Sequence, residues 1–133
     1  MKKFTLALIA ITIIAVGFIV VSSNDTTDNN STPNAELTTI QNDLDAGAVL
    51  VDVRTPAEFA QSHAVSAINV PLQNIQQGDY GSLQPDQKLY IYCRSGNRSA
   101  QAISILNQNG YNDTIDLVSL TQWQSLGGDV TSN

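Results

Sequence analysis

Residues 89–110 read Leu-Tyr-Ile-Tyr-Cys-Arg-Ser-Gly-Asn-Arg-Ser-Ala-Gln-Ala-Ile-Ser-Ile-Leu-Asn-Gln-Asn-Gly. The apolar run over residues 89–92 predicts a buried strand, and the amphipathic run over residues 99–108 predicts a helix that ends near Gly110. Between them lies Cys93, the only cysteine of the chain, with two arginines close by. A helix N-terminus and nearby cations both favour the thiolate form of a cysteine. The stretch therefore predicts a reactive cysteine where a strand meets a helix.

Length and composition narrow the possible functions. The chain has 133 residues, room for one domain, and its formal net charge is −6. An acidic protein of this kind is not expected to bind nucleic acid or anionic lipid head groups. A single cysteine excludes an intramolecular disulfide, and with a single histidine it argues against a zinc site built by this chain alone. We expect neither a metal nor a cofactor.

The N-terminal segment predicts export. Lys2 and Lys3 precede an uncharged apolar run of 18 residues, 4–21. This run is longer than a usual signal-peptide core of about 7–15 residues and matches the shortest membrane spans, at about 17–25 residues. We interpret residues 1–21 as a signal peptide or an N-terminal membrane anchor. In either case the lysines stay in the cytoplasm, so the protein is expected in the periplasm, either free or anchored in the inner membrane through residues 4–21 alone.

A polar segment separates this run from the folded part of the chain. Residues 22–34 are rich in Ser, Thr, Asn and Asp and have too few apolar side chains to fold alone, which predicts a disordered linker. Residues 35–133 are the predicted domain. Helices are expected over residues 36–45, 56–62, 72–77, 99–108 and 120–126, and strands over residues 48–53, 67–70, 89–92 and 114–118.

This alternation is typical of one class of fold. Strands that alternate with short helices predict an α/β domain with a mostly parallel sheet of about five short strands and helices on both faces. In such sheets ligands bind beyond the C-terminal ends of the strands, which is where Cys93 falls. The segment from Thr55 to Glu58 also has the pattern of a capping box at the start of a helix.

Two segments resemble the rhodanese family of sulfurtransferases. Residues 50–59 read Leu-Val-Asp-Val-Arg-Thr-Pro-Ala-Glu-Phe, and residues 91–100 read Ile-Tyr-Cys-Arg-Ser-Gly-Asn-Arg-Ser-Ala. Both occur in the order and spacing of the family, and the likeness spans most of residues 35–123. The resemblance implies a rhodanese-like three-layer domain. The exported single-domain layout is similar to the periplasmic rhodaneses of the phage-shock type.

The chain departs from the family pattern in two places. Residues 63–67, His-Ala-Val-Ser-Ala, stand where relatives have His-Ile-Pro-Gly-Ala, a change expected to affect only a turn. Ser119-Leu120 stands where relatives have a Gly-Gly pair before the final tryptophan. Because that pair lies near the active-site mouth in relatives, this second change is expected to alter substrate access more than the chemistry.

The resemblance implies sulfur transfer through Cys93. A thiolate at Cys93 would take a sulfane sulfur from an anionic donor such as thiosulfate and pass it to a thiophilic acceptor, which can be cyanide, a thiol or a protein. Backbone N–H groups of the loop would stabilise the bound anion or persulfide, and Gly96 would permit the tight curl. The residues expected to bind substrate are Arg94, Ser95, Gly96, Asn97, Arg98 and Ser99.

Loop length separates two chemistries within the superfamily. The loop from Cys93 to Arg98 is six residues long, as in the sulfurtransferases. Related phosphatases and arsenate reductases have a loop one residue longer, which leaves room for a tetrahedral oxyanion. The six-residue loop therefore favours sulfur transfer. Two alternatives are a non-catalytic rhodanese-homology binding module and a persulfide carrier to a protein acceptor, and the presence of Cys93 argues against the first.

Several other residues have simpler structural explanations. Asp52 and Arg54 are expected to form an ion pair or cap at the end of a strand, near the site but without a chemical role. His63 is expected to be a hydrogen-bonded turn residue, since an ionised thiol needs no base. Arg94 has the alternative of a solvated surface charge, and Arg98 that of tying the loop down.

Overall fold

The computed structural model describes residues 33–133. The predicted export segment, residues 1–21, and linker residues 22–32 lie outside the described residues. Helix α1 (Pro33–Asp45) includes the last two residues assigned to the linker, so that the folded part begins at Pro33 rather than Ala35. Within residues 33–133, no helix combines the length and the apolar character needed to cross a membrane.

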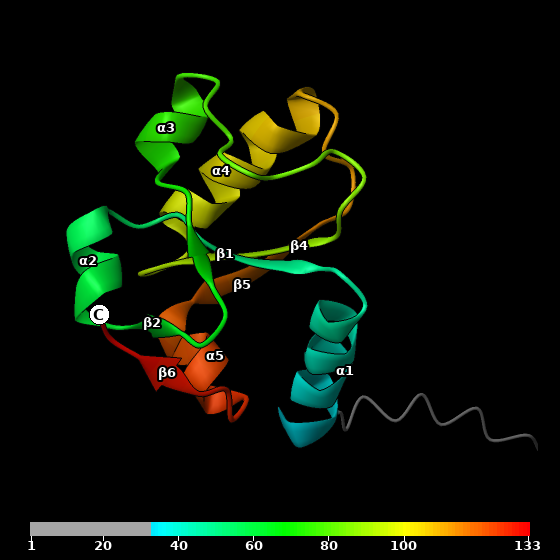
Figure 1. Ribbon diagram of the computed structural model, residues 1–133, viewed down its shortest axis with the longest axis vertical. Coiled ribbons are helices and arrows are strands. Elements are labelled where there is room, and N and C mark those ends of the chain that lie inside the picture. Colours follow the sequence, from blue (N-terminus) through cyan, green and yellow to red (C-terminus); the bar gives the residue numbers. More distant parts are fainter. Residues whose placement is uncertain (1–32) are drawn as a thin grey trace, which may run out of the picture.

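A parallel sheet forms the centre of the domain (Figure 1). Its strands are β1 (Val49–Asp52), β3 (Ile68–Asn69), β4 (Leu89–Cys93) and β5 (Thr114–Ser119), in the order β3-β1-β4-β5. Every neighbouring pair is parallel, as the alternation of strands and helices predicts. The mostly parallel sheet with helices around it is confirmed, with four strands where about five were expected.

Helices cover both faces of the sheet. Figure 1 shows α3 (Leu72–Gln76) and α4 (Asn97–Gln108) on one side, and α1 and α5 (Leu120–Ser125) on the other. All five residues of β4 are buried, and their side chains alternate between the two faces. Leu89, Ile91 and Cys93 belong to the core under α3 and α4, while Tyr90 and Tyr92 belong to the core under α1 and α5. Such double burial explains why β4 is an unbroken apolar run.

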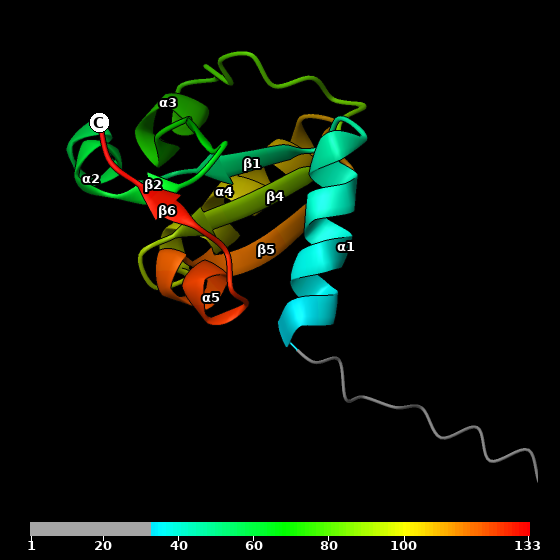
Figure 2. The ribbon, with the colours of Figure 1, turned by 60° about the horizontal axis from the view of Figure 1, so that its bottom comes forward.

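The remaining strands form a small separate sheet. Strand β2 (His63–Ala64) pairs antiparallel with β6 (Val130–Thr131), so the end of the chain returns to the segment that follows α2 (Pro56–Gln61). Figure 2 shows β6 beside β2, with the C-terminus next to α2. Neither strand was predicted from the sequence, because neither lies in a largely apolar segment like residues 67–70, which contain the equally short β3.

Two helix starts bear on the site. The capping box predicted before α2 is present: the Glu58 N–H donates to the Thr55 hydroxyl, and the Glu58 carboxylate accepts from the Thr55 N–H. Helix α4 begins at Asn97, two residues earlier than predicted. The residue before it, Gly96, has φ +91°, in the left-handed region that glycine adopts most readily.

Candidate active site

The Cys93 sulfur lies at the C-terminal end of β4, at the start of the loop that leads into α4. The residue is only 1% exposed. The backbone N–H of Gly96 donates to Sγ over 3.1 Å, because the left-handed conformation of Gly96 turns this N–H toward the sulfur. The loop therefore curls around the sulfur atom, as the sequence predicts.

Hydrogen bonds set the ionisation of this thiol. Burial by itself raises the pKa of Cys93, but the backbone N–H groups of Ser99, Ser95 and Gly96 and the Ser99 hydroxyl lower it by more. The net pKa lies below the ordinary value of a thiol. At neutral pH a larger fraction of Cys93 is therefore ionised than in an ordinary cysteine. The ionised form, the thiolate, is the nucleophile.

Two hydrogen-bond acceptors also face the sulfur. The Val118 carbonyl oxygen lies 3.5 Å from Sγ and the Ser99 hydroxyl oxygen lies 3.7 Å from it, both within reach of the S–H of the protonated thiol. Ser99 is buried, and its hydroxyl donates to the Gly96 carbonyl over 3.0 Å. When the thiol ionises, the Ser99 hydroxyl can turn and donate to the sulfur, whereas a carbonyl oxygen can only accept.

The two arginines of the loop have different surroundings. The Arg98 guanidinium forms a bidentate ion pair with the Glu58 carboxylate, at 2.7 and 2.8 Å. This pairing ties the start of α4 to the start of α2, which is the structural role considered for Arg98. Arg94 is exposed. Of the two arginines, only Arg98 is held by an acidic side chain in the described structure, so Arg94 is the better placed to meet an anionic donor.

The other predicted loop residues lie around the same curl. Ser95 and Asn97 are exposed, and the Asn97 side-chain oxygen accepts from Gln101 within α4 over 2.6 Å. Ser95 contributes through its backbone N–H, which lowers the pKa of Cys93. The groups that lower the pKa of the Cys93 thiol are therefore backbone N–H groups of the loop and one side chain, that of Ser99.

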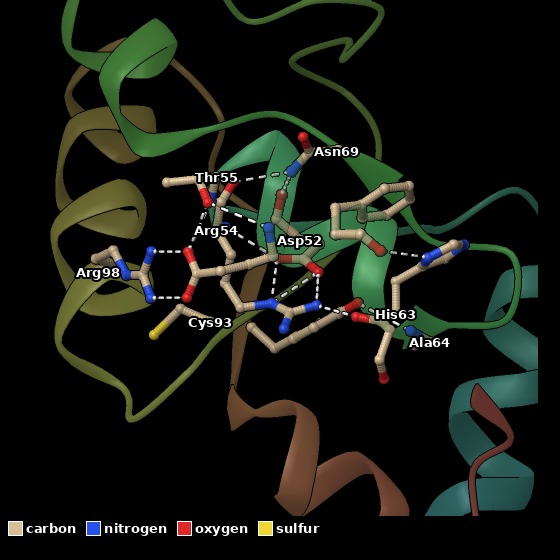
Figure 3. A network of polar contacts seen from close by, with 12 residues as sticks. Asp52, Arg54, Thr55, His63, Ala64, Asn69, Cys93 and Arg98 are labelled. Carbon is tan, nitrogen blue, oxygen red and sulfur yellow. Dashed lines mark hydrogen bonds and ion pairs between the residues drawn. The ribbon is translucent and has the colours of Figure 1, made fainter. Parts of the chain in front are cut away.

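Asp52 and Arg54 form the predicted ion pair beside this loop (Figure 3). Asp52 is completely buried and accepts from the backbone N–H of Arg54 at 2.9 Å as well as from its guanidinium. Arg54 also donates to the Ser62 carbonyl and lies over the Tyr92 ring, 5.7 Å from its centroid. Figure 3 shows Arg54 beside Asp52, and Arg98 near Cys93 in the same network of polar contacts. The Asp52–Arg54 pair joins β1 to the end of α2.

His63 and two aromatic residues of the core are buried. His63 is 7% exposed, its Nδ1 lies 2.8 Å from the Phe59 carbonyl oxygen, and its ring stacks on that of Phe59. Tyr111 is 5% exposed and Trp123 is 3% exposed. Within residues 33–133, no group of three or more His, Cys, Asp or Glu side chains is arranged to hold a metal ion.

Sequence reasoning missed two residues of the site. Glu58 was assigned only to the capping box, yet it also binds Arg98, 40 positions away. Val118 was assigned only to a strand, yet its carbonyl oxygen faces Cys93 and its φ is +63°. Val118 directly precedes Ser119-Leu120, where the sequence departs from the Gly-Gly pattern.

The comparisons with known proteins agree with this arrangement. Residues 35–125 match the model of the rhodanese-like domain. The chain is 35% identical over 105 residues to thiosulfate sulfurtransferase 16 of Arabidopsis thaliana. The aligned region covers 68% of this chain and 86% of the relative. It is 36% identical over 63 residues to the thiosulfate sulfurtransferase PspE of Escherichia coli, which covers 46% of this chain and 60% of the relative.

A solved structure shows the same fold. A rhodanese from Escherichia coli, solved with anions, superposes with a TM-score of 0.56 at 25% identity and covers 65% of this chain and 99% of that structure. Among three further curated relatives, the chain spans between 19% and 64% of the relative's length. The family match nevertheless includes both α2 and the whole Cys93 loop. This chain belongs to the family of rhodanese-like domains.

Proposed function

We propose that this protein is a sulfurtransferase that carries a sulfane sulfur as a persulfide on Cys93. The observation that carries the proposal is the position of the Cys93 sulfur, inside a loop whose N–H groups and Ser99 hydroxyl lower its pKa. A lowered pKa favours the thiolate, which is the nucleophilic form, without a separate base. Relatives named as thiosulfate sulfurtransferases support the same assignment.

The reaction has two displacements at sulfur. In the first, the Cys93 thiolate attacks the outer sulfur of thiosulfate. A bond forms between the two sulfurs, the S–S bond of thiosulfate breaks, and its electron pair leaves with sulfite. In the second, cyanide attacks the terminal sulfur of the persulfide, the S–S bond to Cys93 breaks, and thiocyanate and the thiolate are produced. Charge balances in each step, so neither an oxidant nor a reductant is needed.

The loop supplies what both intermediates require. A persulfide carries negative charge on its outer sulfur, and backbone N–H groups at the start of α4 are suited to stabilise it. Arg94, exposed beside the loop, gives a positive charge to an anionic donor in a chain whose net charge is −6. The rhodanese of Escherichia coli solved with anions supports an anion-binding role for this kind of fold.

Mass spectrometry of the intact protein tests the first step. After incubation with thiosulfate, we expect the mass to increase by one sulfur atom, and we expect no increase in the Cys93→Ser variant. Absence of added sulfur on the parent protein would reject sulfur transfer and leave the binding module as the explanation. Thiocyanate release on addition of cyanide then distinguishes a sulfurtransferase, which turns over, from a persulfide carrier, which stays loaded.

We further propose that the domain works in the periplasm. The support is the charge and apolar pattern of residues 1–21, with Lys2 and Lys3 before an apolar run. Fractionation of cells that express the full chain, with mass analysis of the mature N-terminus, tests this. A mature chain that starts after residue 21 in the soluble periplasmic fraction indicates a cleaved signal peptide, an intact chain in the membrane fraction indicates an anchor, and an intact chain in the cytoplasm would reject export.

A further inference from the structure

We propose that Val118 is a specificity-determining residue: it covers Cys93 and restricts the site to small sulfur donors and acceptors. The inference rests on the proposed sulfur transfer. Val118 is 43% exposed, while Cys93 beneath it is 1% exposed. Large apolar side chains at the surface of a small domain are common, but this one lies against the reactive loop.

The Val118 carbonyl and side chain both contact the Cys93 loop. Its carbonyl oxygen lies 3.5 Å from Cys93 Sγ. Its side chain packs on Gly96, so closely that a Cβ at Gly96 would come within 2.9 Å of Val118 Cγ1. The Gly96 N–H approaches the sulfur at 3.1 Å. Cys93 is therefore enclosed between the loop backbone and Val118.

The backbone holds Val118 in an unfavourable conformation. Its φ of +63° lies in the left-handed region, which β-branched residues rarely adopt. The Asp116 carboxylate accepts from the Val118 N–H over 2.7 Å, and a register irregularity in β5 places Val118 opposite Tyr92. The next residue, Ser119, caps α5 by accepting from the Gln122 N–H over 3.1 Å. Contacts on both sides therefore maintain the strained residue over the thiol.

This enclosure limits where an added sulfur can lie. A sulfur bonded to Sγ is about 2 Å from it. On the line toward Val118 it would overlap the carbonyl oxygen, and on the line toward Gly96 it would overlap the backbone nitrogen, so the outer sulfur must lie away from both lines. A donor approaching Cys93 passes the Val118 isopropyl group. Thiosulfate is compact, whereas a donor with an aromatic group needs the space that the two methyl groups occupy.

Alkylation of Cys93 by reagents of different size tests the cover without requiring sulfur transfer. The quantity is the ratio of second-order rate constants for N-phenylmaleimide and for N-methylmaleimide, measured at one pH in the parent protein and in Val118→Ala, Val118→Gly and Val65→Ala. Val65 is a valine of the same exposure, 43%, next to β2, and serves as the matched control. We expect the ratio to rise at least tenfold in both Val118 variants and to stay within twofold in Val65→Ala. A ratio within twofold of the parent in Val118→Ala and Val118→Gly would overturn the proposal.

Sulfur loading then separates this inference from the proposed function. We expect kcat/KM for an aromatic thiosulfonate, relative to that for thiosulfate, to rise about tenfold in Val118→Ala. Changed alkylation ratios with no sulfur loading in any variant would reject sulfur transfer but keep the cover. Normal loading with unchanged ratios would reject the cover alone. Because glycine adopts φ +63° without strain, Val118→Gly is expected to melt at or above the parent temperature, which keeps the test valid if Val118→Ala unfolds.

Discussion

At the scale of single residues, hydrogen bonds stabilise the thiolate of Cys93 by more than burial destabilises it. The pKa of Cys93 is lowered although burial raises it, because N–H groups of the loop donate to the sulfur and the Ser99 hydroxyl can donate to it once the thiol ionises. We expect the rate of alkylation by iodoacetamide to increase with pH around a midpoint below about 8.5, the value of a free cysteine. As the pH rises through this midpoint, the thiolate replaces the thiol.

Substitution of Ser99 tests how far its hydroxyl lowers the pKa of Cys93. Ser99→Ala removes the hydroxyl and keeps the backbone N–H, so we expect the midpoint to shift upward while remaining below that of a free thiol. Ser104→Ala, on the exposed side of the same helix, is the control and should leave the midpoint unchanged. A parent midpoint at or above about 8.5 would contradict the prediction.

A second prediction at the scale of single residues concerns the Glu58 carboxylate. Its pKa is lowered, first by the hydrogen bonds from Arg98 and then by those from Thr55. Because the folded pKa is below the unfolded one, its stabilisation is complete above about pH 4.3 and is lost as the pH falls toward the folded value. Glu58→Gln is expected to lower the free energy of unfolding by about 1 kcal/mol at pH 7.

Urea denaturation at several pH values measures this effect. The difference between the parent and Glu58→Gln should shrink between pH 5 and pH 2.5, as Glu58 of the unfolded parent protein is protonated while the folded carboxylate stays ionised. Glu36→Gln, at an exposed position of α1, is the matched control and should show little difference at any pH. A difference for Glu58→Gln that stays constant over this range would show that ionisation of Glu58 is not its source.

At the scale of secondary-structure elements, the Asp52–Arg54 pair connects β1 to α2. Asp52 is fully buried at the end of β1, and Arg54 extends from it to the Ser62 carbonyl at the end of α2. Asp52→Asn leaves a buried guanidinium without its counter-charge, which we expect to lower the free energy of unfolding by about 3 kcal/mol. Asp45→Asn, at the exposed end of α1, is the control, and an equal loss in both variants would contradict a special role for the pair.

At the scale of the whole molecule, the C-terminal segment, residues 128–133, packs against Trp123 and the end of α2. The Trp123 indole N–H donates to the Asp129 carbonyl over 2.9 Å, and the Asn133 N–H donates to the Ala60 carbonyl over 3.1 Å. Gly128 lies so close to Trp123 that a Cβ added at Gly128 would come within 2.1 Å of the indole ring. We expect Gly128→Ala to lower the free energy of unfolding by roughly 3 kcal/mol through overpacking.

The matched control is another glycine. Gly78 has φ +78° and open space around it, so Gly78→Ala introduces backbone strain without a clash and should cost about 1 kcal/mol. Urea denaturation followed by the fluorescence of Trp123, the only tryptophan, measures both variants. If Gly128→Ala were no more destabilising than Gly78→Ala, the close packing of the C-terminal segment on Trp123 would not be a source of stability.

The sequence alone determined the features that depend on neighbouring residues. The apolar run of β4, the curl at Gly96 and the start of α4 follow one another in the chain, so their pattern identified Cys93 and its loop. The capping box from Thr55 to Glu58 is equally local and was predicted correctly. The strands β2 and β6 were not predicted, whereas the equally short β3 was, because β3 lies in the largely apolar segment 67–70.

Only the tertiary structure decided which residues surround the sulfur and the arginines. Glu58 binds Arg98 across 40 positions, and the Val118 carbonyl faces Cys93 across 25. Such contacts depend on the order of strands in the sheet, which brings the C-terminal ends of β1, β4 and β5 to one edge. The sequence therefore indicated Cys93 through short-range pattern, while strand pairing and packing, which join distant residues, bring the Val118 carbonyl to its sulfur and Glu58 to Arg98.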